Sequence, residues 1–261
     1  MLIGILFLIT IIMPVIFWLW FFLSQDRADP EPRKLLVKIF LLGIGAFFLA
    51  MAIEVTLFSI VFPSQFQDIL LQNILQRGLK KSFFVTFTLT TAVMFFLAGL
   101  IEEFLKYFVL WEFAYSKREF NQIADGVFYG VTLALGFSLV ENVLYFYKLS
   151  SAPIIIFASV SFIRGIATML LHITTAGYIG YGLGKMKFTV GHNKSIILKF
   201  LFLAILLHSL FNVLVLLPHG LIFAFSILFL AFIYLLSILG RPETNLVWRL
   251  KAPQNIVNKS D

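Results

Sequence analysis

The sequence predicts an all-α protein, a polytopic transmembrane helical bundle of about seven spans, within a range of about six to eight. Of its 261 residues 61% are hydrophobic, and the mean hydropathy is +0.99. Only 13% of the residues are charged, which is too few for an ordinary soluble domain. Apolar blocks about as long as the 20 residues that cross a bilayer follow one another, with short polar loops between them.

Seven apolar stretches are the expected spans. The first has no basic residue ahead of it and no small-residue cleavage site behind it, so we expect a retained span rather than a secretory signal. The segment from Pro63 to Lys81 has apolar residues at helical spacing and predicts a helix on the membrane surface. The expected spans are Leu2 to Leu23, Leu35 to Phe62, Phe83 to Phe113, Ala124 to Tyr147, Pro153 to Gly184, Ile196 to Leu217 and Leu221 to Leu239.

Basic residues predict the orientation of the chain. They cluster after the first, third and fifth spans and in the tail, which are alternate loops. Because cytoplasmic loops carry an excess of Lys and Arg, we expect a multi-pass protein of the cell membrane with its amino terminus outside and its carboxyl terminus in the cytoplasm. The net charge of +7 is spread over these loops, without a basic run interleaved with aromatic residues. The predicted partner is therefore the lipid bilayer and not nucleic acid.

Ionisable side chains inside the spans are the candidates for chemistry. Each costs about 2.5 to 3.5 kcal/mol to insert, and such a side chain usually faces the bundle interior and has a partner. The absence of cysteine excludes disulfides, thiolate metal sites and cysteine nucleophiles. The candidates are Glu102, Glu103 and Lys106 in the third span, Asp125, Glu141 and Asn142 in the fourth, Arg164 and His172 in the fifth, and His208 and Asn212 in the sixth.

The spacing of these residues predicts that some of them meet. Glu102 and Lys106 are four residues apart, as are His208 and Asn212, so each pair shares one helix face. Glu102, His172 and His208 each lie roughly nine or more residues inside a span, or about 13 Å at helical rise. We therefore expect these three side chains at a similar depth.

Carboxylates and imidazoles from separate helices at one depth indicate a divalent metal ion, with zinc as the expected ion. A catalytic zinc site uses three protein ligands and keeps one position open. The sequence offers Glu141, His172 and His208 as ligands, with Glu102 or Glu103 as the general base.

Charge balance favours the same grouping. Together with a divalent ion, Lys106 and Arg164 would balance the four carboxylates of the third and fourth spans, Asp125 included.

Simpler interpretations remain open for the same residues. Glu102 or Glu103 can form a structural ion pair with Lys106, and Glu141 can be a polar residue bonded to a neighbouring helix. An intramembrane histidine is more often a hydrogen-bonding residue between helices than a ligand. Glu54 in the second span matches no motif, and we expect at most a pair with a basic neighbour.

Several motifs resemble those of one family. The run from Ile101 to Lys106 resembles the EExxK motif of the PrsW family of intramembrane proteases, which is related to the CAAX-processing and bacteriocin-immunity membrane proteases. The resemblance covers roughly Asp26 to Leu217. Further matches, in order, are Asp29-Pro30-Glu31-Pro32-Arg33 (acidic, proline-rich first loop), Asp125-Gly126-Val127 with Tyr129-Gly130 (DG…YG), Gly136 to Asn142 (GFxxxEN), Arg164, His172 with Gly177 and Gly184, and His208 to Asn212 (HxxxN).

This resemblance implies an intramembrane metal-dependent endopeptidase. Its substrate would be a membrane-embedded or juxtamembrane regulatory protein, as a member of the family in a sporulating bacterium cleaves an anti-sigma factor. We expect one transmembrane domain over 1–240, with a catalytic core at about 83–217, and a short polar cytoplasmic tail over 241–261. The implied roles are Glu102 and Glu103 as catalytic glutamates, Lys106 as the partner of one of them, Glu141, His172 and His208 as ligands or their close supports, and Asn212 as a residue that orients an imidazole or binds the oxyanion.

Two other functions fit buried carboxylates and histidines. A proton- or ion-coupled transporter or channel would use them as an ion path. However, the inverted repeats and broken helices common in transporters are not visible in the sequence. A non-catalytic membrane scaffold or immunity protein would carry the same fold without cleaving anything.

Overall fold

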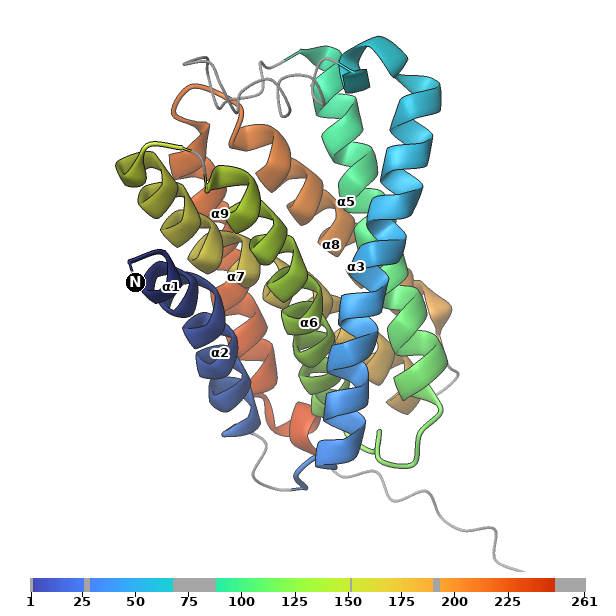
Figure 1. Ribbon diagram of the computed structural model, residues 1–261. Coiled ribbons are helices and arrows are strands. Elements are labelled where there is room, and N and C mark those ends of the chain that lie inside the picture. The colour runs from blue at the N-terminus through green and yellow to red at the C-terminus, as the bar shows by residue number, and fades with distance from the viewer. Residues whose placement is uncertain (1, 26–28, 68–87, 151, 190–192, 247–261) are drawn as a thin grey trace, which may run out of the picture.

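The computed structural model describes residues 2–25, 29–67, 88–150, 152–189 and 193–246, and every regular element in these ranges is a helix. The predicted all-α fold is therefore confirmed. Figure 1 shows the helices as a bundle of long, roughly aligned rods. The elements are α1 (Leu2–Phe7), η1 (Leu8–Ile12), α2 (Met13–Leu23), α3 (Arg33–Val61), α5 (Leu89–Leu110), η2 (Trp111–Tyr115), α6 (Ile123–Leu149), α7 (Ile154–Phe188), α8 (Lys194–Leu214), α9 (Gly220–Leu239) and η3 (Pro242–Asn245).

Each predicted span has a helix. Within the described ranges, six helices are long and apolar enough to cross a membrane, counting α1, η1 and α2 as one. The helix α5 has 22 residues, but it is not one of these six because it carries the three charged residues Glu102, Glu103 and Lys106. Most of the predicted surface helix at Pro63 to Lys81, the start of the third predicted span and most of the predicted tail lie outside the described residues.

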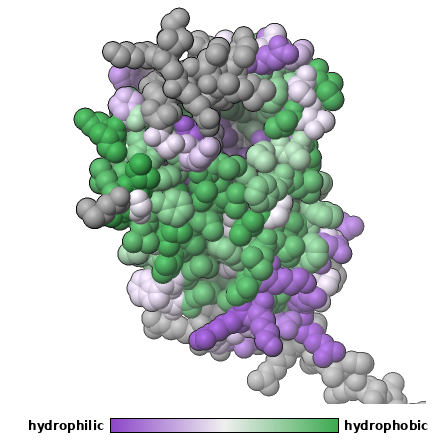
Figure 2. Space-filling view, viewed as in Figure 1, coloured by the Kyte–Doolittle hydropathy of each residue, from purple (hydrophilic) through white to green (hydrophobic). Residues whose placement is uncertain are grey.

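The helices α6 and α7 form the centre of the bundle. The helix α3 packs on α6 and α5, while α8 packs on α7 and α5, and α9 packs on α7. Figure 1 shows α6 and α7 between the first span on one side and α3 with α5 on the other. The face seen in Figure 2 is mostly apolar across its middle, with hydrophilic side chains toward its lower and upper edges, as expected for a bundle surrounded by lipid.

Glycines bring the backbones of α6 and α7 into contact. A Cβ atom on Gly126 would meet the carbonyl of Gly180, and a Cβ on Gly180 would meet the carbonyl of Gly126. One turn along α6, a Cβ on Gly130 would meet the carbonyl of Ala176. Such close approach through small residues is a common way to pack membrane helices. The glycines of the DG…YG stretch therefore have a packing role.

The acidic, proline-rich first loop is attached to the beginning of α6. The buried Glu31 accepts a hydrogen bond from the Tyr129 hydroxyl, and Asp29 Oδ2 accepts one from Asn121 Nδ2 at 2.7 Å. Asp125 Oδ2 accepts from the backbone N–H of Asn121 at 2.6 Å and from that of the next residue at 2.6 Å. These contacts fix the entry of α3 relative to the central helix pair.

Candidate metal centre

The centre is built from side chains on α5, α6, α7 and α8. On α5 the inward face is a stripe at helical spacing that includes Gly99, Glu103, Lys106 and Leu110, all buried. Glu103 and Lys106 are 0% exposed. His172 on α7 and His208 on α8 are 2% and 3% exposed. The two histidines, which were expected at a similar depth, therefore lie in one buried polar cluster with Glu103 and Lys106.

Glu102, His172 and His208 form a group that could hold a metal ion. Each offers one ligand atom, and these atoms all lie within 4.8 Å of one another. Glu102 Oε2 is 3.9 Å from His172 Nδ1 and 3.9 Å from His208 Nε2. This oxygen is buried and has no hydrogen-bond partner in the described part of the chain. A buried carboxylate oxygen without a partner is costly, and one carboxylate with two imidazoles is a donor set that suits zinc.

Each imidazole in this group has a carboxylate on its other side. Glu103 Oε1 is 2.6 Å from His208 Nδ1, and Glu141 Oε2 is 2.8 Å from His172 Nε2. The remaining nitrogen of each ring is the one nearest to Glu102. A second carboxylate commonly orients a metal-binding histidine and makes it more basic. Glu141, which the sequence suggested as a ligand, contacts the ring nitrogen of His172 that is not the one near Glu102.

Two basic residues balance the carboxylates. Lys106 Nζ lies 2.8 Å from Glu103 Oε1, 2.7 Å from His172 Nδ1 and 3.7 Å from Glu102 Oε2. Arg164 Nη2 is 2.7 Å from Glu141 Oε1. Both residues were predicted as supports, and the structure brings both to the cluster.

The other predicted supports are less close to it. Asn142 follows Glu141 on α6, and its Oδ1 lies 3.1 Å from the Thr168 hydroxyl. Asn212, one turn beyond His208, is half-buried and takes no part in the hydrogen bonds described for this cluster. Asp125 precedes Glu141 by 141 − 125 = 16 residues on the same helix, which is about 24 Å at helical rise. It belongs to the anchor of the first loop, so the charge balance of the cluster does not include it.

Glu54 on α3 is the residue that sequence reasoning missed. Its Oε1 is buried and unpartnered among the residues that the structure describes, and its carboxylate interacts electrostatically with those of Glu102 and Glu141. The only signal in the sequence was an ionisable residue inside an apolar span. In the structure, Ala46, Ala50 and Phe58 are buried at intervals that place Glu54 on the same inward stripe.

Exposure increases across the cluster in one direction. The side chains of Glu103 and Lys106 are fully buried, whereas those of Glu102, Glu141 and Arg164 are 13%, 17% and 22% exposed. The cluster is therefore accessible from the side of α6 and α7 that carries Glu141 and Arg164.

A transmembrane bundle with a buried carboxylate and imidazole group that is open on one side defines a class, the metal-dependent hydrolases that work within the membrane. Residues 31–238 match the model of the PrsW family intramembrane metalloprotease. The Protease PrsW of Clostridioides difficile is 31% identical over 218 residues, which is 82% of this chain and 80% of that protein. The Protease PrsW of Bacillus subtilis is 28% identical over 201 residues, or 77% of each chain.

A third relative, the Protease PrsW of Halalkalibacterium halodurans, is 37% identical over 123 residues, which is 47% of this chain and 54% of that protein. No solved structure matches the chain. The chain belongs to the PrsW family of intramembrane metalloproteases. The resemblance inferred from the motifs is confirmed, the protein is a multi-pass membrane protease, and the transporter hypothesis is not supported.

Proposed function

We propose that this protease cleaves a membrane-embedded or juxtamembrane regulatory protein, with a zinc ion held by Glu102, His172 and His208. The observation that carries the ligand assignment is Glu102 Oε2, which has no hydrogen-bond partner among the described residues, lies 3.7 Å from Lys106 Nζ and is 3.9 Å from each of two imidazole nitrogens. In this assignment Glu103 and Glu141 orient the two imidazoles through the ring nitrogens that face away from Glu102.

The chemistry needs a Lewis acid, a base and charge compensation. A bound divalent ion would polarise the scissile carbonyl and favour ionisation of water at neutral pH. We assign the base to Glu103, whose buried Oε2 has no hydrogen-bond partner in the part of the chain described, while its Oε1 is held by Lys106 and His208. Glu103 would take the proton of the attacking water and pass it to the leaving amine. Lys106 stabilises the carboxylate form of Glu103, which is present before the first proton transfer and is restored by the second.

Two conservative variants test this assignment. Because Glu102 is the proposed ligand, Glu102→Gln should lose both bound metal and cleavage. Glu103→Gln should lose cleavage and keep the metal, since an amide oxygen can still accept a hydrogen bond from His208 Nδ1. The measurements are metal content by mass spectrometry and cleavage of a panel of synthetic transmembrane peptides by purified protein in detergent. The matched control is Glu112→Gln, at an exposed residue of η2.

The opposite pattern would contradict the assignment. If Glu103→Gln loses the metal and Glu102→Gln retains it, the roles of the two glutamates are exchanged. If both variants cleave like the parent protein, neither residue is catalytic and the proposed mechanism is wrong.

We also propose that the amino terminus is outside, the carboxyl terminus is cytoplasmic, and 1–240 forms one domain with its catalytic core at about 83–217. The support is the basic composition of alternate loops. Because the chain has no cysteine, single cysteines report sidedness without background. An impermeant maleimide added to intact cells should label Ser150→Cys and spare Ser116→Cys, both at exposed positions. Labelling of Ser116→Cys alone would reverse the proposed orientation.

A further inference from the structure

Arg164 on α7 is separated from His172 by one side chain, that of Glu141. Arg164 Nη2 is 2.7 Å from Glu141 Oε1, and Glu141 Oε2 is 2.8 Å from His172 Nε2. The side chain of Arg164 is 22% exposed, whereas that of His172 is 2% exposed. The position of the guanidinium therefore determines where Glu141 meets the imidazole of the candidate metal centre.

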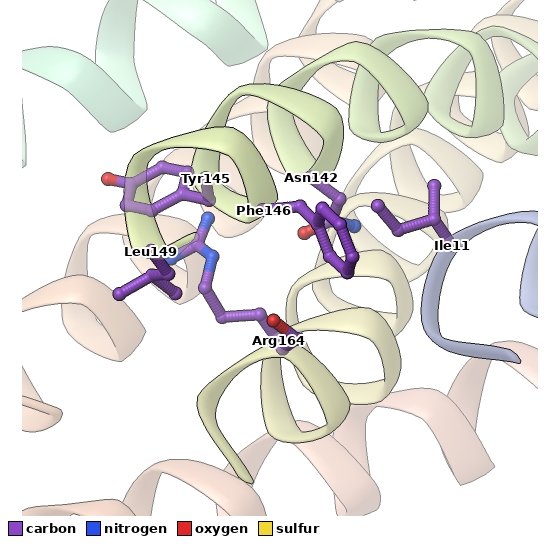
Figure 3. A pocket seen from close by; sticks show the side chains of 7 residues that line it. Ile11, Asn142, Tyr145, Phe146, Leu149 and Arg164 are labelled. Carbon is purple, nitrogen blue, oxygen red and sulfur yellow. The ribbon is translucent and has the colours of Figure 1, made fainter. Parts of the chain in front are cut away.

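The guanidinium of Arg164 is stacked on the ring of Tyr145. Tyr145 lies on α6, one turn beyond Glu141, and the guanidinium carbon Cζ is 3.4 Å from the centre of the ring. Figure 3 shows the two groups beside each other. A guanidinium is planar and is attracted to the face of an aromatic ring. The ring therefore restricts the guanidinium to one plane.

A small cavity between η1, α6 and α7 is also lined by Arg164 (Figure 3). Its volume is about 10 Å³, which is room for one water molecule. Three atoms of its lining residues are buried and have no hydrogen-bond partner among the residues described: Arg164 Nε, Asn142 Nδ2 and Ser161 Oγ. Two of these are N–H donors, and the third is a hydroxyl that can donate or accept. One water molecule can accept from both N–H groups and donate to the hydroxyl.

Apolar side chains close this cavity. They are Ile11 of the first span and Phe146 and Leu149 of α6. A Cβ atom on Gly165 of α7 would collide with the Thr10 carbonyl, so the glycine permits η1 to approach α7 at this point. Because these walls shield the polar atoms from lipid, the partner of those atoms must be small enough to fit in the cavity.

An arginine inside a membrane span needs local partners to stay in place. Its charge is poorly solvated by hydrocarbon, and its long side chain can reach toward the aqueous surface instead. Glu141 contacts one end of the Arg164 guanidinium. The ring of Tyr145 covers its face, and a water molecule in the cavity would bind Nε. Each of these contacts reduces the number of positions that the side chain can take.

We propose that Arg164 is fixed from two sides, by the ring of Tyr145 and by one bound water molecule. Asn142 and Ser161 bind this water. Arg164 fixed in this way holds Glu141 against the imidazole on α7, which keeps the orientation that a metal ligand needs. Tyr145, Asn142 and Ser161 are therefore positioning residues that act through Arg164. The inference rests on the proposed metal centre, but one of its tests requires neither metal nor cleavage.

Substitution of Tyr145 tests the stacking. In the full-length, zinc-loaded protein in detergent, Tyr145→Leu should transfer zinc to a chelator about tenfold faster and lower kcat for peptide cleavage about tenfold, with KM unchanged. Tyr145→Phe keeps the ring and should match the parent protein in both measurements. The matched control is Tyr147→Leu, at a 66% exposed position of the same helix. If Tyr145→Phe changes as much as Tyr145→Leu, or if Tyr145→Leu behaves like the parent protein, the ring does not fix Arg164.

A second substitution tests the water site. Ser161→Ala removes one of the three groups that bind the water, so zinc release should become about threefold faster. The control is Ser159→Ala, at an exposed position of the same helix. Equal release rates in the two serine variants would contradict the water site.

A double substitution distinguishes positioning through Arg164 from general damage. If Tyr145 acts through Arg164, the variant with both Tyr145→Leu and Arg164→Gln should release zinc no faster than Arg164→Gln alone. Losses that multiply would overturn the proposal. If the parent protein binds no metal, the proposed metal centre is wrong, and thermal unfolding decides the role of the ring. Tyr145→Leu should then lower Tm in the parent protein and leave it unchanged in Arg164→Gln, and an equal decrease in both would contradict the stacking.

Discussion

The two ends of the α6–α7 pair differ sharply. At one end, α6 is buried from Ile123 to Ser138, and α7 is buried from Leu171 to Gly184. There the backbones touch through Gly126 and Gly180. At the other end, residues 139–149 and 154–166 alternate between buried and exposed, and the pair carries Glu141, Asn142, Ser161 and Arg164. Glu141 and Arg164 of the candidate metal centre lie at this second end, and His172 lies just inside the buried stretch of α7.

The difference shows how a helix pair can be both stable and reactive. Polar groups at the open end that have no partner in the described ranges, Asn142 Nδ2 and Arg164 Nε among them, cost about 1 to 3 kcal/mol each unless water binds them. The close-packed end offsets this cost and holds the helices in register, so that charged side chains at the open end keep their geometry without filling the space beside them. Stability and function are thus assigned to different turns of the same helices.

The largest expected effect comes from the centre itself. His208→Asn removes a proposed ligand and should reduce cleavage at least about a thousandfold, because metal ligation contributes several kcal/mol of transition-state stabilisation. The assay is peptide cleavage in detergent. The control is His219→Asn, because His219 is exposed, lies between α8 and α9 and has a φ of 60°, which asparagine tolerates. Equal losses in both variants would mean that the effect is not specific to the centre.

A smaller loss of activity is expected when the ion pair between Arg164 and Glu141 is removed. Arg164→Gln releases Glu141 from its ion pair, so the orientation of His172 is less fixed, and kcat should fall about 10- to 100-fold. Metal should remain bound at saturating concentration. Steady-state kinetics would separate this outcome from a purely structural role, in which activity and folded protein decline together while kcat per folded molecule stays constant.

The close-packed end should respond in stability. Gly126→Ala places a methyl group against the backbone of Gly180 and should destabilise the fold by about 1 to 3 kcal/mol. Gly45→Ala on α3 is the matched control, because a Cβ there meets nothing within 4 Å. Thermal unfolding in detergent should show a lower Tm for Gly126→Ala only. An unchanged Tm would show that this contact is not tight.

The weakest expected effect concerns the loop anchor. Asp29→Ala removes one hydrogen bond to Asn121 and should cost about 0.5 to 1.5 kcal/mol, with kcat unchanged. The same thermal assay measures it against Glu119→Ala, at an exposed loop position. A loss of cleavage in Asp29→Ala without a loss of stability would instead give the first loop a direct role.

Much of the fold could be predicted because apolar blocks of bilayer length leave few alternatives. Predicted spans and observed helices agree to within a few residues at most ends; α8 ends at Leu214 rather than at Leu217, shortly before Pro218, which cannot continue a helix. The meeting of Glu102, His172 and His208 also followed from depth alone. Their chemical roles did not, because a ligand and its support differ only in which oxygen faces which nitrogen, and helical spacing does not determine this.

Two other residues show the limits of pattern reasoning. Asp125 was grouped with the site because it is a charge near a span, but it caps the distant end of α6. Glu54 had no motif, and only the burial of Ala46, Ala50 and Phe58 in the structure shows that it lies on the inward stripe of α3, because its sequence neighbours are apolar on all sides. Motif matching detects residues that a family shares, whereas helix geometry detects which residues face the same space.

Metal analysis of the purified protein tests the central claim most directly. We expect about one zinc ion per chain in the parent protein and in His219→Asn, and loss of that ion in His172→Ala and in His208→Ala. A parent protein that cleaves peptides without any bound divalent ion, or histidine variants that keep the ion, would contradict the metal centre described here.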